Sequence, residues 1–217
     1  MNRFVSVLSL ILGVLLSFGA IAQTSTDLTL TAQLLVAARQ GEVKTVERLL
    51  AQGAAPNSRN RLGKTPLLMA SEKGNLALAE VMLKVGADVN QPSLERVTPL
   101  MAASYVGNAA LARLLLGAGA GTEALDRMHK PAIVYAAGQG HVEVLSILLD
   151  HGVPIDARYE NDLTALMWAA GQGHADAVKL LLARGADTDL CDARGMTAAA
   201  IASQAGHAEV AALFSAR

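Results

Sequence analysis

The stretch "GKTPLLMASEKGNLALAEVMLKVGADVN", Gly63–Asn90, contains the signals for two short helices joined by a tight turn. Thr65 suits an N-cap, because its hydroxyl can accept an N–H of the first turn. Pro66 follows at the first helical position, where its missing N–H costs nothing. Gly74 predicts the end of the first helix in a left-handed conformation, and Gly86 predicts the end of the second. The stretch therefore predicts a helix–turn–helix unit.

The same unit recurs along the chain every 33 residues. The helix openings are Thr65-Pro66-Leu67, Thr98-Pro99-Leu100, Pro131-Ala132-Ile133, Thr164-Ala165-Leu166 and Thr197-Ala198-Ala199. The alanine five residues on is Ala70, Ala103, Ala136, Ala169 and Ala202, and its small size predicts a close approach of the two helices of a pair. A fixed period of this length is typical of a stacked repeat array, in which each unit buries its apolar face against the next.

The pattern resembles the ankyrin repeat, over about residues 28 to 217. The resemblance implies an all-α repeat solenoid of stacked helix-turn-helix repeats with short hairpin loops. The units are 28–60, 61–93, 94–126, 127–159, 160–192 and a shortened 193–217. In the family a histidine after Thr-Pro-Leu ties adjacent loops together, and its replacement here by Leu68, Met101, Val134, Met167 and Ala200 predicts weaker ties. Because "GVPID" (Gly152–Asp156) in the fourth unit departs from the usual turn, we expect the array to be least regular there.

The composition supports closely packed helices. Hydrophobic residues make up 52% of the 217 residues, but aromatic residues only 3%, so the apolar mass is Ala, Leu and Val. A net charge of −1 gives no indication of a nucleic-acid or anionic-membrane partner. Cys191 is the only cysteine, which excludes an intramolecular disulfide.

The N-terminus predicts export. Arg3 precedes an apolar run that ends near Ala22, and Ala20-Ile21-Ala22 fits a signal-peptidase site. We expect residues 1–22 to be a signal peptide cleaved after Ala22, residues 23–27 to be a short polar segment, and the product to lie in a bacterial periplasm. The alternative is an uncleaved membrane anchor, because the run is near the length needed to span a bilayer.

No motif predicts catalysis, a metal or a cofactor. His141, His174 and His207 recur at the starts of the second helices, but stacked helices lie ~8–10 Å apart and ligands of one zinc must lie within ~2.1 Å of it. We expect these histidines to bond to local backbone. Asp187–Gly195 begins like a calcium loop but lacks its glycine and closing glutamate. Cys191 has no predicted neighbouring base, so we interpret it as a bare thiol.

The remaining candidate site is a surface. In the ankyrin architecture the hairpin tips and the exposed faces of the first helices form one concave wall, where partners of the family usually dock; here the tips are 57–64, 90–97, 123–130, 156–163 and 189–196. The first tip carries a charge of +3 and the fourth −2. Arginine and aromatic side chains commonly anchor interfaces. The candidate partner-binding residues are Arg59, Arg61, Arg96, Tyr105, Arg127, Tyr135, Arg158, Tyr159 and Trp168. Tyr135 and Trp168 also fit an alternative role as filling between repeats.

These observations predict a non-enzymatic protein–protein interaction module in the periplasm, without cofactor, metal or nucleic acid. Exported bacterial ankyrin proteins include some thought to support oxidative-stress enzymes such as catalase, and others that resemble immunity proteins neutralising secreted toxins. The sequence leaves both partners open. An enzyme with an unrecognised thiol site at Cys191 is the alternative from a different class.

Overall fold

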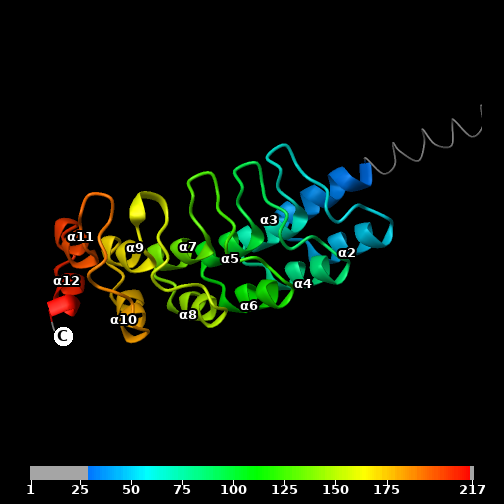
Figure 1. Ribbon diagram of the computed structural model, residues 1–217. Coiled ribbons are helices and arrows are strands. Elements are labelled where there is room, and N and C mark those ends of the chain that lie inside the picture. Colours follow the sequence, from blue (N-terminus) through cyan, green and yellow to red (C-terminus); the bar gives the residue numbers. More distant parts are fainter. Residues whose placement is uncertain (1–28, 216–217) are drawn as a thin grey trace, which may run out of the picture.

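The computed structural model describes residues 29–215 and shows two rows of short helices beneath a row of hairpins (Figure 1). A helix over 29–40 comes first. The inner row contains α3 (Pro66–Glu72), α5 (Pro99–Val106), α7 (Ala132–Gly138), α9 (Ala165–Gly171) and α11 (Ala198–Gln204). The outer row contains α2 (Val43–Ala51), α4 (Leu76–Lys84), α6 (Ala109–Gly117), α8 (Val142–Asp150), α10 (Ala175–Ala183) and α12 (Ala208–Ser215). The expected signal peptide and the segment 23–27 lie outside the described residues.

Each row is a stack of neighbours, which confirms the predicted all-α repeat solenoid. Every inner helix packs on the inner helix of the next repeat, and the outer helices do the same. In the described part of the chain the only extended pairing is an isolated bridge between Cys191 and Thr197. The molecule is therefore elongated, and its hairpins project side by side along one edge (Figure 1).

Threonine caps start most inner helices, as predicted. The hydroxyls of Thr65, Thr98, Thr164 and Thr197 each accept the N–H three residues on, at 3.2–3.3 Å. Pro131 stands at the equivalent position before α7 and offers no such acceptor. A cap of this kind stabilises a helix by about 1 kcal/mol, so α7 depends more on burial than its neighbours do.

The histidines at the starts of α8 and α10 bond to backbone, but the expectation of a local partner is wrong. His141 Nε2 lies 2.9 Å from the carbonyl oxygen of Tyr105, and His174 Nε2 lies 3.0 Å from that of Gly138. Both acceptors belong to the preceding repeat. Asn75 and Asn108 make the same kind of bond to Gly41 and Gly74. These side chains therefore hold the end of one inner helix to the start of the next outer helix.

The core runs through the whole stack. The alanine series Ala70, Ala103, Ala136, Ala169 and Ala202 is fully buried, which confirms the close approach of the inner helices. At the position of the missing histidine, Leu68, Met101, Val134 and Met167 are at most 2% exposed. These repeats thus exchange a polar tie between loops for apolar burial, which contributes about 25 cal/mol per Å².

The prediction that the "GVPID" turn would be the least regular part is wrong. Gly152 has the same left-handed backbone as the equivalent glycines, and the N–H of Val153 donates to Leu148 as Ala186 donates to Leu181 one repeat later. The irregular element is instead the fourth hairpin, where a short 3-10 turn, η1 (Glu160–Asp162), replaces the usual loop.

Candidate partner-binding surface

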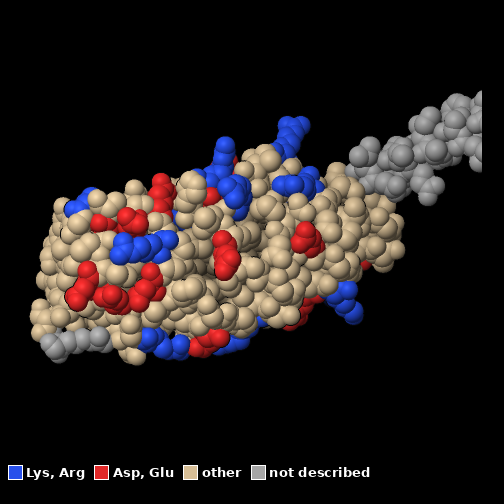
Figure 2. All heavy atoms as spheres, viewed as in Figure 1, with Lys and Arg blue, Asp and Glu red and all other residues tan. Residues whose placement is uncertain are grey.

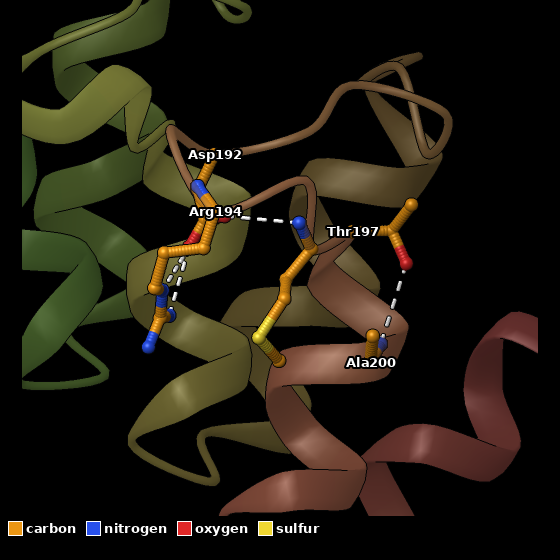
Figure 3. A network of polar contacts seen from close by, with 5 residues as sticks. Asp192, Arg194, Thr197 and Ala200 are labelled. Atoms are coloured by element: carbon orange, nitrogen blue, oxygen red, sulfur yellow. Dashed lines mark hydrogen bonds and ion pairs between the residues drawn. The ribbon is translucent and has the colours of Figure 1, made fainter.

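A short polar side chain organises most of the hairpins from within. Asp126 Oδ1 accepts the N–H groups of Met128 and Lys130, both at 2.8 Å. Asp192 does the same two hairpins further along the chain. One of its oxygens accepts the N–H groups of Arg194 and Met196 at 2.9 Å, and the other accepts from the Arg194 guanidinium (Figure 3). Backbone N–H donors, chiefly that of Met196, hold the pKa of Asp192 below its usual range.

Tyr159 explains why the fourth hairpin differs. It occupies the position held by Asn60, Ser93, Asp126 and Asp192 in the other hairpins, each of which accepts N–H groups of its own loop. A tyrosine at this position provides no such local acceptor. The loop closes through η1 instead, and Asn161 and Asp162 both adopt left-handed backbone conformations.

The tips also differ in how they are joined. The N–H of Leu94 donates to Leu62, that of Arg127 to Glu95, and that of Ala193 to Asn161, at 2.9–3.1 Å. Within the described residues no equivalent backbone bond joins the hairpins at 128 and 160. His129 and Glu160 face each other across this gap at 3.9 Å. The third and fourth hairpins therefore lack the backbone bond that joins the other neighbouring pairs among the described residues.

Three successive tips carry charged or titratable side chains on strained backbone. Gly63 and Gly195 occupy a left-handed position in the first and fifth hairpins, where glycine is favoured. At the same register Arg96, His129 and Asp162 have φ of +61°, +52° and +58°. A side chain in this conformation costs roughly 1–3 kcal/mol, and such strain tends to collect at functional sites.

An aromatic row lies on the exposed faces of α5, α7 and α9, below these three tips. The rings of Tyr105 and Tyr135 meet edge to face, with centroids 6.0 Å apart. The hydroxyl of Tyr135 donates to the buried carboxylate of Asp126. Lys130 Nζ lies 4.4 Å from the centre of the Trp168 ring. Burial, together with the nearby Asp126 carboxylate, raises the pKa of Tyr135 above its ordinary value.

Tyr135 and Trp168 combine the two roles that the sequence left open. Both side chains pack against the core and are only partly exposed, yet both line hollows on the wall. Tyr105 is 54% exposed. Tyr159 was expected to be an exposed anchor, but it is partly buried and packs against the core, and burial raises its pKa to about 12. Its ring thus stabilises the fourth hairpin.

Several of the candidate arginines tie hairpins together. Arg59 donates to the carbonyl oxygens of Gly63 and Pro92, at 3.0 and 2.7 Å. Arg127 pairs with Glu95 at 3.1 Å. Arg158 lies 4.0 Å from Asp162 and 3.5 Å from the carbonyl oxygen of Cys191, whereas Arg61 and Arg96 are exposed on their tips. The structure therefore brings three of the four aromatic candidates, Tyr105, Tyr135 and Trp168, into one row and distributes the arginines along the hairpin edge.

Charged side chains are distributed unevenly over the face in view. Basic side chains project from the hairpins of the N-terminal half, and acidic side chains gather over the C-terminal half of the face in view (Figure 2). Much of the area between them is uncharged. Lys64 of the basic first tip is paired with Glu72 at 2.7 Å, so Arg61 is the more available cation there.

Sequence reasoning missed two residues that shape the surface. Gly138 stands where Tyr105 stands one repeat earlier, and this exchange opens a hollow of about 230 Å³ beside Trp168. Lys130 lines the same hollow. The repeat register contains this signal, because aligning the first helices places the glycine opposite the tyrosine.

The described residues form neither a thiol site around Cys191 nor a metal-binding cluster. Cys191 is partly buried, and its thiol approaches only the carbonyl of Asp189, at 3.6 Å. Over residues 29–215 no three His, Cys, Asp or Glu side chains are grouped to hold a metal ion. In the same range no helix is long and apolar enough to cross a bilayer.

Comparison with known families agrees with this geometry. The profile described as "Ankyrin repeats (3 copies)" matches residues 14–93, 34–126, 100–190 and 133–216 in overlapping copies. The chain belongs to the ankyrin-repeat family. Ankyrin repeats generally bind other proteins, which makes a protein–protein interaction module the coarse functional assignment. No curated protein sequence matches this ankyrin-repeat chain.

Proposed function

We propose that this ankyrin-repeat chain is an exported, non-enzymatic adaptor that binds another periplasmic protein through its wall. The observation that supports the proposal is the aromatic row of Tyr105, Tyr135 and Trp168, which lies exposed or half-exposed beside hollows of the inner helices. An oxidative-stress enzyme is the first partner class to test.

Site-directed capture tests the binding face. Tyr105→Ala removes an exposed anchor, and it should leave the melting temperature nearly unchanged, because exposed positions shift stability by only about ±0.5 kcal/mol. Loss of such an anchor costs ~2 kcal/mol of binding, roughly thirtyfold in affinity. Lys84→Glu, on the outer helix α4, is the matched control. Capture that survives Tyr105→Ala but is abolished by Lys84→Glu would place the partner on the opposite side.

N-terminal analysis tests export. The expected result is a mature chain beginning at Gln23 in the periplasmic fraction, because Ala20-Ile21-Ala22 fits a cleavage site. A product that retains Met1 and fractionates with membranes would contradict the proposed soluble form.

A further inference from the structure

Two neighbouring hollows lie along the aromatic row. The first has a volume of about 300 Å³ and lies between α3, α5 and α7; its lining residues are Glu72, Val97, Met101, Ala102, Tyr105, Val106 and Tyr135. The second has a volume of about 230 Å³ and lies between α5, α7 and α9; its lining includes Tyr105, Tyr135, Gly138, Trp168 and Lys130. Tyr105 and Tyr135 line both hollows, so their edge-to-face pair forms the partition between them.

Small residues beside large aromatic ones create these hollows. Gly138 has no side chain to cover the space that Tyr105 covers one repeat earlier, and a Cβ there would reach only ordinary contact with Trp168, 3.7 Å from Cε3. Ala102 similarly leaves space beside Tyr135 in the first hollow. Each hollow is large enough for one apolar side chain and is walled by aromatic rings, which give a large contact area to such a side chain.

The repeat spacing is expected to set the separation of the two hollows, because they belong to successive repeats and packed helices lie ~8–10 Å apart. A polyproline II segment advances about 3.1 Å per residue with three residues per turn, so side chains three positions apart lie on one face about 9 Å apart. A β-strand places residues three apart on opposite faces, and residues two apart only about 7 Å from each other. The spacing therefore favours the polyproline II form.

The residues that line the second hollow favour an acidic group on the occupant. Lys130 is its only cation, and none of its lining residues is a carboxylate. The exposed side chains of Gln139 and Gln172 lie along the same rim. Because a polyproline II backbone makes no internal hydrogen bonds, its carbonyl groups are available to such amides. In the first hollow the single carboxylate, Glu72, is already paired with Lys64.

The three strained residues lie on the hairpins that lead into these helices. Arg96, His129 and Asp162 precede α5, α7 and α9, which are the helices that line the second hollow. The first and fifth hairpins, away from that hollow, retain glycine at the same register. The left-handed side chains therefore lower stability in the three hairpins beside the aromatic row, whereas the flanking hairpins have glycine at this position.

We infer that the wall binds a proline-rich segment of the partner in polyproline II conformation, with apolar residues at positions i and i+3 in the two hollows and an acidic residue beside Lys130. The inference rests on the proposed function and specifies the partner's chemistry. Aromatic-lined grooves are the general solution for binding this conformation, because the segment is preformed and loses little entropy.

Synthetic peptides test the spacing. The probes are proline-rich decapeptides with two leucines separated by one, two or three residues and one glutamate after the second leucine. Trp168 is the only tryptophan of the chain, and it lines both the second hollow and a further hollow between the third and fourth hairpins, so its fluorescence reports binding at this part of the wall. The peptide with two intervening residues should bind at least tenfold more tightly than the other two. Equal affinities, no saturable binding up to 1 mM, or tighter binding of a helical alanine-rich peptide would overturn the inference.

A charge exchange tests the role of Lys130. Lys130→Glu should weaken binding of the glutamate peptide at least tenfold and should favour a peptide with lysine at that position. Lys84→Glu should change neither affinity. Unchanged preference in Lys130→Glu would refute the assigned acid. If Tyr105→Ala abolishes capture of the natural partner while no peptide binds, the proposed function stands and this inference fails. If Tyr105→Ala leaves capture of the natural partner unchanged, the proposed function itself fails.

Discussion

Replacement of Gly140 by alanine separates two reasons for a glycine at the end of an inner helix. Gly140 has φ of +71°, and an added Cβ would lie 2.7 Å from Cγ and Nδ1 of His174. Gly152, in the same repeat, has φ of +86° and nothing within 4 Å of the same added atom. Gly152→Ala therefore measures left-handed strain alone, whereas Gly140→Ala adds a steric conflict with the imidazole.

The expected difference follows from the geometry. Left-handed strain costs roughly 1–2 kcal/mol in both variants. In Gly140→Ala the ring of His174 must move toward ordinary contact at 3.4–4 Å, which weakens its 3.0 Å bond to the Gly138 carbonyl. Overpacking costs about 1–3 kcal/mol, and a lost hydrogen bond costs about 0.5–1.5 kcal/mol. Gly140→Ala should therefore be less stable than Gly152→Ala by about 2 kcal/mol.

Denaturation followed by far-UV circular dichroism measures this difference. For a protein of this size about 2 kcal/mol corresponds to roughly 4–8 °C in melting temperature. Adding His174→Ala to Gly140→Ala removes the obstructing ring, so the double variant should cost less than the sum of the single changes. Equal stability of Gly140→Ala and Gly152→Ala, within about 0.5 kcal/mol, would refute the packing role of the imidazole.

Three further predictions concern the hairpins. Arg96→Gly should raise the free energy of unfolding by ~0.5–1 kcal/mol, because relief of the left-handed side chain at φ +61° exceeds the entropy cost of ordering a glycine; a lower melting temperature would contradict this. Asp192→Asn should lower the melting temperature at pH 7. Because the folded pKa of Asp192 lies below its usual value, its stabilising contribution is present above about pH 4 and is lost as pH falls through the folded pKa, so the two melting curves should converge in acid. A constant difference between them down to pH 2 would exclude that charge. Tyr159→Ala should destabilise the protein by ~1–3 kcal/mol in chemical denaturation, since its ring is partly buried, and an unchanged midpoint would show that the ring contributes nothing.

The repeat signals predicted the backbone well because they act locally. Thr65 caps its helix and Pro66 opens it through contacts within one turn, and the same residue types recur at a fixed register. The hollows could not be predicted this way, because they depend on which side chains face each other across repeats. Gly138 matters only because Tyr105 precedes it and Trp168 follows it on neighbouring helices.

The fourth hairpin shows a different limit. The sequence of Gly152–Asp156 departs from the ankyrin consensus, but the turn keeps the backbone hydrogen bonds of the other repeats. Departure from the consensus alone therefore did not indicate irregular structure. Tyr159 was interpreted as an exposed anchor, although its register is that of a loop-organising acceptor such as Asp126. Comparison of positions 60, 93, 126, 159 and 192 would have located the change.

The bonds from Asn108 to Gly74 and from His174 to Gly138 give the stack a direction. In each case the acceptor is in one repeat and the donor is in the repeat that follows it in the chain. The carbonyl group at the end of an inner helix is thus bonded by the repeat that follows it, and not by the repeat before it. Gain or loss of a whole copy preserves every such pairing at the new junction, since the donor arrives with the copy that follows. An array built in this way can change its length during evolution without redesigning the junctions between its copies.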